Sequence, residues 1–245
     1  MRIALITGGS KGIGLEAVRR FVELGFQVIT CSRNSSIWQD QVKNEPLLDT
    51  VDYHQIDISQ ETQVQSLFSN ISKKYGKLDV VINSASPKIE SMGKFETLDT
   101  SSLYHTLMQD FWSHALCLKH ELLLMGAGGV IVNVSSTCGI RPTPNAAMYS
   151  ASKHALEGLT RSIALEAIEN GVRINAVAPG VTWTPRWDER AIDKPTIHDD
   201  VAKTVPLKRF AEPKEIVDAI EFLVSDKSSY IVGHTLIVDG GISLV

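Results

Sequence analysis

Tyr149 and Lys153 stand four residues apart in YSASK, with only small residues between them. On a helix, two such residues share one face, with their Cβ atoms about 5–6 Å apart. A free tyrosine has a pKa of about 10, and a nearby cation lowers that pKa because it favours the phenolate. The pair is therefore a candidate acid/base device. Taken alone, the pentapeptide fits more simply an ordinary helix start, with the tyrosine packed inward and the lysine in solvent.

A glycine cluster follows the first apolar run of the chain. Glycines stand at positions 8, 12 and 14 of LITGGSKGIG, a GxxxGxG spacing that differs from the usual GxGxxG fingerprint. Glycine lets backbone amides approach a pyrophosphate, and a helix N-terminus favours the anion. A plain tight turn needs only one of the three, so the cluster favours a dinucleotide site. The candidate cofactor contacts here are Thr7, Gly8, Ser10, Lys11, Gly12, Ile13 and Gly14.

Ser32 and Arg33 end the second apolar run, where a fold that prefers NAD places an acidic residue for the ribose 2′-hydroxyl. An acid would repel a 2′-phosphate, whereas Arg33 can pair with it. Lys11 adds a second positive charge nearby. The sequence therefore favours NADP(H) as the cofactor, and two exposed basic residues without a ligand are the simpler alternative.

Alternating strands and helices are needed to position these residues, and the sequence predicts them. Short apolar runs predict strands at 2–7, 26–31, 51–57, 78–83, 129–135, 172–178 and 235–240. Helical periodicity covers 12–24 and recurs near 60–75, 99–125, 149–170 and 213–225. Repeated strand–helix–strand units imply a parallel sheet with helices on both faces. We expect a Rossmann-type, doubly wound α/β fold of about seven strands.

The 245 residues suit one large α/β domain, and no repeat or long linker divides them, so we assign residues 1–245 to a single domain. Residues 181–206 break the alternation with three prolines, two tryptophans and many charges. A long insertion of this kind is often functional. We expect a lid over the substrate; a solvated loop with one short helix fits the composition equally well.

Composition excludes several classes of function. The net charge is −4 with both signs interspersed, which argues against a nucleic-acid binder. Cys31, Cys117 and Cys138 are isolated, so neither a metal site nor a disulfide framework is expected. No apolar run reaches the roughly 18 residues that span a membrane. An apparent strand starts at residue 2, in place of a secretory signal, so we expect a cytoplasmic protein. We also expect its partner to be a small-molecule substrate.

Together these motifs resemble the short-chain dehydrogenase/reductase family over essentially the whole length, most nearly its bacterial 3-oxoacyl-(acyl carrier protein) reductase-like members. The matching positions are the glycine motif from Thr7 to Gly14, Asp57 with Ile58, Asn83, Ser136, Tyr149 with Lys153, Pro179-Gly180, Thr184 and the VDGG near the C-terminus. Each motif alone is modest, but their shared order and spacing make a chance match very improbable.

The resemblance implies a role for each matched residue. Tyr149 would donate a proton to the substrate oxygen as hydride arrives from NADPH, and Ser136 would hydrogen-bond the carbonyl. Lys153 would lower the pKa of Tyr149 and hold the nicotinamide ribose. Asp57 would contact adenine, and Thr184 would bind the nicotinamide carboxamide. No metal is required.

Two positions depart from the family pattern. Where the family reads Asn-Asn-Ala-Gly, this chain reads Asn83-Ser84-Ala85-Ser86, so a serine replaces the glycine that leaves room for the cofactor ribose. Asp110 stands where the family has a catalytic asparagine, and no Asn occurs between Asn83 and Asn133 to replace it. Asp110 is therefore included among the candidate catalytic residues.

Asp110 carries a specific expectation. Its carboxylate would keep Lys153 protonated and would cancel part of the lysine's field at Tyr149, so the phenol would titrate higher than in relatives with asparagine. The enzyme would then reduce carbonyls better than it oxidises alcohols near neutral pH. Alternatively, Asp110 is itself protonated, or faces away, and changes nothing.

The leading hypothesis is an NADPH-dependent carbonyl reductase, or the reverse alcohol dehydrogenase. The alternative is a nucleotide-binding regulatory or scaffold protein with weak catalysis, which rests only on Ser86 and Asp110. An epimerase or dehydratase of nucleotide sugars is disfavoured because the chain is too short for the usual substrate domain. Residues 85–98 and 181–206 would shape the substrate pocket. Trp183 and Trp187 would give it an apolar lining, or would pack against the core.

Assembly is expected from two helical segments that carry apolar residues on more than one face. The first holds Leu103, Leu107, Phe111, Leu116 and Leu118, and the second holds Ala155, Leu156, Leu159, Ile163 and Leu165. Such helices are buried on most sides. Family members bury them against symmetry mates, so a homodimer or homotetramer is expected.

Overall fold

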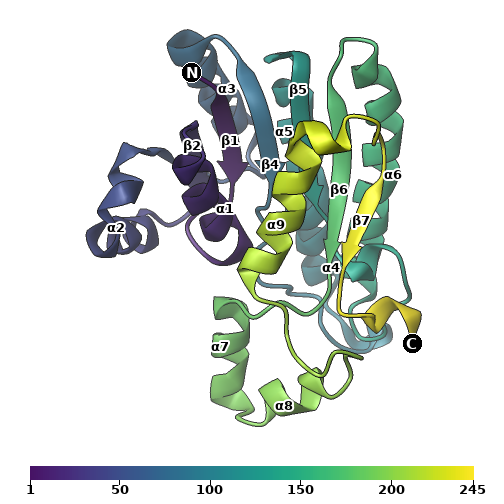
Figure 1. Cartoon of the computed structure of the whole chain (residues 1–245). Coiled ribbons are helices and arrows are strands. Elements are labelled where there is room, and N and C mark those ends of the chain that lie inside the picture. Colours follow the sequence, from purple (N-terminus) through teal and green to yellow (C-terminus); the bar gives the residue numbers. More distant parts are fainter.

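The computed structural model describes all 245 residues and contains one sheet of seven parallel strands (Figure 1). The strands are β1 (Ile3–Thr7), β2 (Gln27–Ser32), β3 (Asp52–Gln55), β4 (Leu78–Asn83), β5 (Met125–Val134), β6 (Arg173–Pro179) and β7 (Thr235–Val238). Their order across the sheet is β3-β2-β1-β4-β5-β6-β7. Every predicted strand is present, so the predicted doubly wound fold is confirmed.

The strand order reverses at β1. This strand pairs with β2 on one side and with β4 on the other, so Thr7 lies beside both Cys31 and Asn83. In doubly wound sheets, ligands bind beyond the carboxyl ends of the strands at such a switch point. A ligand crevice is therefore expected where β1 and β4 end.

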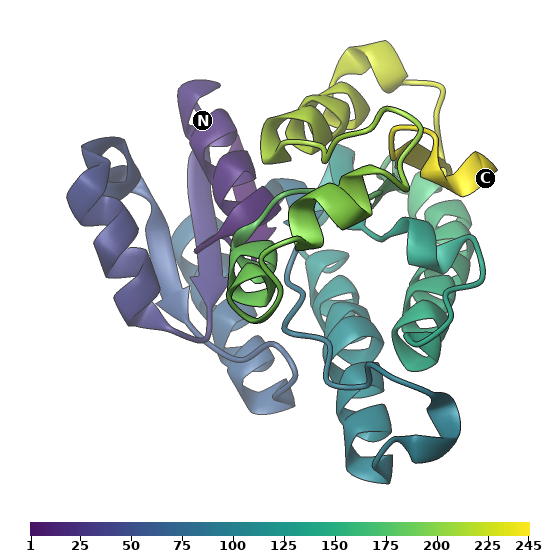
Figure 2. The ribbon, with the colours of Figure 1, turned by 90° about the horizontal axis from the view of Figure 1, so that it is seen from below.

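Helices cover both faces of the sheet. Helices α1 (Gly12–Glu23) and α9 (Pro213–Val224) pack on one face, and α3 (Glu61–Tyr75), α5 (Ser113–Glu121) and α6 (Ala147–Ile168) pack on the other (Figure 2). Successive strand residues face opposite layers. Accordingly Ala4 and Ile6 belong to one apolar core cluster, while Ile3 and Leu5 belong to the other.

The predicted helical segment near 99–125 is present from Thr100 to Glu121, but its middle is π-helical. It consists of α4 (Thr100–Leu107), a π-helical turn (Met108–Trp112) and α5, and β5 begins already at Met125. A π turn inserts an extra residue into the helix, and such turns are frequent at functional sites. Asp110 lies in this turn.

A further helix, α2 (Ser35–Asn44), was not predicted because it has no apolar stripe: Trp38 is its one buried residue. Its start is fixed locally, since the Asn34 side chain accepts a hydrogen bond from the backbone N–H of Ser36 at 2.9 Å. This N-cap signal was present in the sequence.

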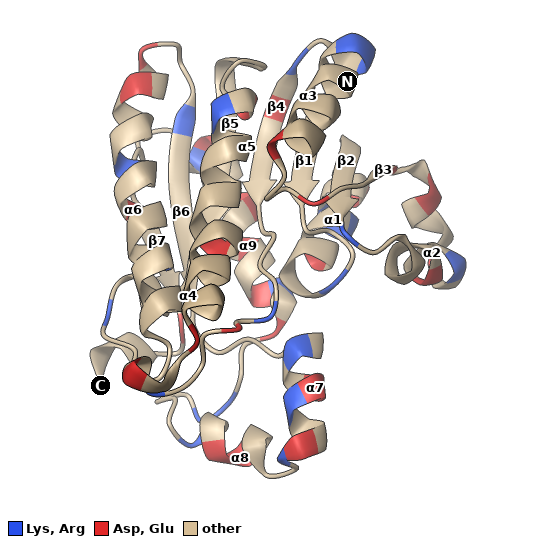
Figure 3. Ribbon diagram, turned by 180° about the vertical axis from the view of Figure 1, so that it is seen from behind, with Lys and Arg blue, Asp and Glu red and all other residues tan.

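The insertion at 181–206 forms two helices, α7 (Pro185–Asp193) and α8 (Ile197–Ala202), beyond the carboxyl ends of the strands (Figure 1). The expectation of a loop with one short helix is therefore wrong. Helix α7 carries both basic and acidic residues (Figure 3). No helix in the chain combines the length and apolar composition that a membrane crossing requires.

Candidate active site

The glycine turn after β1 is closed so tightly that side chains do not fit. Gly8 has a φ of 75°, and a Cβ there would lie 2.6 Å from Cα of Ala85. A Cβ on Gly14 would lie 2.3 Å from the Gly8 carbonyl oxygen. Gly12 has a φ of 60°. Gly8 and Gly14 are thus required by the protein's own packing, and Gly12 is required by its backbone conformation.

Helix α1, which follows this turn, presents an N-terminus without a cap. Lys11 occupies the N-cap position but makes no side-chain hydrogen bond there, and the first turn holds no acidic residue. The first amides of a helix have no partner within the helix and attract anions. The α1 N-terminus is therefore suited to hold the pyrophosphate of a dinucleotide.

Thr7 and Asn83 have side chains that serve the protein's interior. The Thr7 hydroxyl accepts hydrogen bonds from the backbone N–H groups of Ser84 and Ala85, at 3.2 and 3.3 Å, and so fixes the exit of β4. Asn83 is fully buried, and its amide donates to Glu121 and Asn133 at 2.9 and 3.0 Å. These contacts make both residues supports of the crevice wall.

The candidate residues for the adenosine end surround the ends of β2 and β3. Arg33 is exposed, and its side chain has no hydrogen bond or ion pair. The Ser32 hydroxyl lies 3.0 Å from the Tyr53 hydroxyl. The Asp57 carboxylate accepts from the backbone N–H and hydroxyl of Ser59, at 2.9 and 2.8 Å, and Ile58 is buried. Arg33 is therefore the charged side chain at this end that has no partner within the protein.

The insertion at 181–206, called the lid after its expected role, begins against the glycine turn. A Cβ added to Gly12 would lie 3.3 Å from the Thr184 Cγ2 atom, so the residue before α7 borders the proposed cofactor site. Lys11 lies 3.8 Å from Glu189 of α7. Gly180, which follows Pro179, packs so closely on Asp239 that a Cβ would lie 2.7 Å from its Cα. The exit of β6 and the start of the lid are thus in place beside α1.

Tyr149 and Lys153 lie together on α6, both buried. The Lys153 ammonium lies 5.7 Å from the centre of the Tyr149 ring and donates to the Val134 carbonyl at 3.3 Å. The simpler interpretation, with the lysine in solvent, is wrong. Burying an ammonium costs free energy unless partners compensate, and the predicted acid/base pair requires this placement.

Ser136 lies on the loop after β5, and that loop is joined to α6. Its hydroxyl accepts a hydrogen bond from the backbone N–H of Cys138 at 3.1 Å. The Ser150 hydroxyl donates to the Cys138 carbonyl at 2.7 Å, and a Cβ on Gly139 would lie 3.0 Å from Lys153. The three predicted groups Ser136, Tyr149 and Lys153 are therefore brought together by two packed elements.

Burial raises the pKa of the Tyr149 phenol above its ordinary value, and the nearby Asp110 carboxylate adds to this increase. The Arg186 guanidinium and the Ser136 side chain act in the opposite direction. The phenol is therefore held in its protonated form at neutral pH, as a proton donor must be.

Asp110 faces the catalytic pair from the π turn. Its Oδ1 atom lies 4.0 Å from the Lys153 ammonium and accepts from the Ser86 hydroxyl at 2.9 Å, while its Oδ2 atom has no hydrogen-bond partner. The alternative in which Asp110 faces away is excluded. Burial raises the pKa of this carboxyl, against the opposing effects of Lys153, Ser86 and Arg186.

The expectation that Asp110 keeps Lys153 firmly protonated needs correction. Burial lowers the pKa of the Lys153 ammonium, and the attraction of Asp110 only opposes that decrease. Desolvation favours the uncharged form of each partner, and mutual attraction favours the charged forms. Burial therefore opposes the charged form of both Asp110 and Lys153, whereas their attraction supports it.

The two departures from the family pattern are bonded to each other, since Ser86 donates to Asp110. A third residue, Arg186 of α7, completes the contact and was missed by the sequence prediction. Its Nη2 atom donates to the Ser86 carbonyl, the Ser86 hydroxyl and the Pro87 carbonyl at 3.0, 3.2 and 2.8 Å. The sequence signal that could have found Arg186 is its position two residues after Thr184, a predicted cofactor contact.

Trp183 and Trp187 pack within the lid and against Phe210, each with ring centroids 5.0 Å apart. His198 of α8 joins them, 4.8 Å from Trp183 and 5.2 Å from Phe210. The rings thus hold the two lid helices on the segment before α9. Of the two expectations for these tryptophans, packing into the protein describes them better than lining the substrate pocket.

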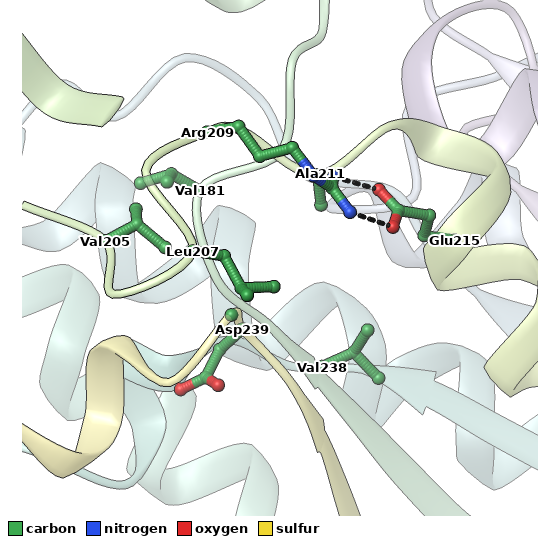
Figure 4. A pocket seen from close by; sticks show the side chains of 9 residues that line it. Val181, Val205, Leu207, Arg209, Ala211, Glu215, Val238 and Asp239 are labelled. Atoms are coloured by element: carbon green, nitrogen blue, oxygen red, sulfur yellow. Dashed lines mark hydrogen bonds and ion pairs between the residues drawn. The ribbon is translucent and has the colours of Figure 1, made fainter. Parts of the chain in front are cut away.

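A small cavity of about 120 Å³ lies between the base of the lid and the end of β7 (Figure 4). It is lined by Val181, Val205, Leu207, Arg209, Ala211, Glu215, Val238, Asp239 and Gly240. Arg209 and Glu215 form a double hydrogen bond of 2.7 Å at its edge. None of the candidate catalytic residues lines it, so we do not assign it to the substrate.

Comparison with known proteins decides the family. Residues 8–243 match the family model described as enoyl-(acyl carrier protein) reductase. The chain belongs to the short-chain dehydrogenase/reductase family. It is accordingly an oxidoreductase, and members of this family use a nicotinamide cofactor, for which the uncapped α1 N-terminus is suited.

Relatives cover essentially the whole of this short-chain dehydrogenase/reductase. Carbonyl reductase family member 4 of Danio rerio is 33% identical over 245 residues, which span 100% of this chain and 99% of the relative. The structure of ElxO with NADP bound has a TM-score of 0.91 at 29% identity and covers 100% of this chain and 99% of its own. A variant of the actinorhodin polyketide ketoreductase with NADPH has a TM-score of 0.90 at 27% identity, with 100% and 98% covered.

Proposed function

We propose that this enzyme uses NADPH to reduce a carbonyl compound to an alcohol, with Tyr149 as the proton donor and no metal ion. The observation that carries the proposal is the buried Tyr149–Lys153 pair, joined to the Ser136 loop and facing the end of β4. A regulatory or scaffold protein has no use for an ammonium buried at this cost.

The residues divide the work as follows. NADPH, when bound, supplies the hydride. Ser136 and Tyr149 hold the carbonyl oxygen, and the Tyr149 hydroxyl donates its proton to that oxygen as negative charge develops there. Lys153 would bind the ribose hydroxyls and support proton return to Tyr149, while Asp110 positions the Lys153 ammonium from 4.0 Å away. Thr184 holds the carboxamide, and Asp57 with Ile58 borders the adenine.

Preference for NADPH over NADH is supported by Arg33. Its side chain is exposed and unpaired at the end of β2, and Ser32 stands beside it where NAD-specific folds carry an acid. We expect Arg33→Ala to weaken NADPH binding about 10- to 100-fold and to leave NADH binding almost unchanged. Fluorescence titration measures both, with Lys43→Ala on exposed α2 as the control. Equal weakening of both cofactors would count against the assignment.

The decisive experiment for the function is NADPH oxidation with a broad panel of ketones and aldehydes. We expect turnover in wild type and a fall of about 10²- to 10⁴-fold in Tyr149→Phe, with unchanged NADPH affinity. Tyr230→Phe, at a fully exposed tyrosine, is the matched control and should retain full activity. Activity that survives in Tyr149→Phe would overturn the proposal.

We also propose a homodimer or homotetramer in the cytoplasm. Several predicted apolar residues, among them Leu116, Leu118 and Leu156, are already buried within one chain. Others remain available for contact: Leu165 in the second segment is 70% exposed, and Trp112, which lies in the first segment, is 44% exposed. Light scattering tests this proposal, and the 26.9 kDa mass of a single chain at micromolar concentration would contradict it.

A further inference from the structure

Arg186 is a half-buried cation with no carboxylate partner. Only its Nη2 atom is bonded within the protein, to two backbone carbonyls and one hydroxyl of the segment Ser86–Pro87. Its Nε and Nη1 atoms have no partner and are not sealed from solvent. By contrast, Arg20 and Arg209 each meet carboxylates directly. The backbone contacts fix the Arg186 guanidinium in place and leave its charge unpaired.

This guanidinium faces the reacting groups. Ser86, which it contacts at 3.2 Å through the hydroxyl, is bonded to Asp110, and Asp110 lies 4.0 Å from Lys153. The charge of Arg186 also lowers the pKa of the Tyr149 phenol, which places it within electrostatic range of the proton donor. Arg186 is thus linked to Asp110 only through the Ser86 hydroxyl, and Asp110 already faces Lys153.

We propose that the substrate is an oxo acid and that Arg186 binds its carboxylate through the donors its backbone contacts leave free. The inference rests on the proposed carbonyl reduction and names its substrate class. A guanidinium that is fixed and half desolvated prefers a carboxylate, because charge-assisted hydrogen bonds are stronger in such surroundings. Ser136 and Tyr149 would hold the carbonyl oxygen while Arg186 fixes the acid group.

The pyrophosphate of the cofactor offers the same anionic chemistry, but its site is separately provided. Lys11 and the free amides of α1 lie at the glycine turn, whereas Arg186 is bonded to the segment after β4. Ser86 stands at the position that borders the expected cofactor ribose, so Arg186 lies between the two expected sites, and NADPH titration of Arg186→Gln distinguishes them.

Matched pairs of substrates test the proposal: 2-oxo and 3-oxo acids of increasing chain length, each beside its methyl ester, with saturating NADPH. We expect wild type to prefer at least one acid over its ester by about 10-fold or more in kcat/KM. Arg186→Gln should lower kcat/KM for that acid about 10- to 100-fold, mainly through KM, and change the ester by less than about threefold. Arg190→Gln, on the same helix and exposed, should behave as wild type.

Two results would overturn the proposal. One is a wild-type enzyme that reduces the esters as well as, or better than, every acid in the panel. The other is an Arg186→Gln variant that loses NADPH affinity in a fluorescence titration and slows acid and ester equally, which would assign the guanidinium to the cofactor. Reduction of the esters that depends on Tyr149 would in either case leave the carbonyl reductase proposal standing.

Discussion

Asp110 and Glu121 are two buried acids about three turns apart on one helical run, and they have opposite surroundings. Asp110 faces the Lys153 ammonium and the Ser86 hydroxyl, with Arg186 behind them. Glu121 meets only the amide of Asn83, at 2.9 Å, and forms no ion pair. The difference separates a carboxyl that faces the proposed catalytic lysine from one that serves the fold.

Glu121 belongs to a chain of neutral polar groups beneath the site. The Asn83 amide donates to Glu121 and to Asn133, and the Asn133 amide donates to the Thr160 hydroxyl at 2.9 Å. Complete burial raises the pKa of Glu121 to about 8, and the Asn83 hydrogen bond only partly opposes this increase. Glu121 therefore joins α5, β4, β5 and α6 as an uncharged acid over most of the neutral range.

The largest expected effect concerns stability at Glu121. Its pKa rises from an ordinary 4.5 to about 8 on folding. The contribution of the protonated acid is thus complete below about pH 4.5 and is lost as pH rises through about 8. The loss is on the order of 5 kcal/mol. Glu121→Gln should remove this pH dependence and unfold at higher temperature than wild type at pH 9.

Thermal unfolding between pH 5 and 9 measures this effect. Glu166→Gln, an exposed change on α6, should keep the wild-type pH dependence. If wild type and Glu121→Gln instead gave parallel curves, Glu121 would be charged in the folded protein, and its contrast with Asp110 would disappear.

Asp110→Asn should act on catalysis and hardly on stability. Removing the negative charge lowers the pKa of Tyr149, because the Asp110 carboxylate is one cause of its increase. The pH profile for alcohol oxidation should move to lower pH by about one unit, while NADPH affinity stays constant. Glu121→Gln should leave the same profile unmoved. An unmoved profile in Asp110→Asn would reject the electrostatic role, and outright inactivity would assign Asp110 a different one.

The sequence was sufficient for the framework and for the grouping of Ser136, Tyr149 and Lys153, because these depend on local periodicity and motif spacing. The strands, the glycine turn and the Tyr149–Lys153 spacing are of this kind. The hydrogen bond between Ser86 and Asp110 joins residues 24 positions apart, so the sequence showed two departures without showing that they meet. The neutral character of Glu121 depends wholly on burial, which its polar residue type concealed.

The contacts of Arg186 and of the lid were likewise not predictable from the sequence. From the sequence, the two tryptophans could line the pocket or pack against the core; in the structure Phe210 contacts both rings, and His198 contacts Trp183. The charge that reaches the site comes from Arg186, whose partners lie about a hundred positions earlier in the chain. Contacts of this range follow from tertiary packing and have no local signature.

Ser86→Gly, which restores the family residue, should have the smallest effect. It removes the hydroxyl that joins Asp110 to Arg186 but keeps the two backbone acceptors of Arg186. The loss of one hydrogen bond of this type changes an equilibrium by roughly 3- to 10-fold. We expect kcat/KM to change by that factor, with stability nearly constant. A loss as large as that of Tyr149→Phe would show that Ser86 acts on the substrate itself.

The ionisation of Tyr149 tests the central claim most directly. The account holds that burial and Asp110 keep this phenol protonated for donation to a carbonyl oxygen. The ultraviolet tyrosinate signal, taken as wild type minus Tyr149→Phe across a pH titration, should therefore show no ionisation of Tyr149 below about pH 10, and Asp110→Asn should bring its onset to lower pH. A Tyr149 tyrosinate signal near neutral pH in wild type would contradict the account.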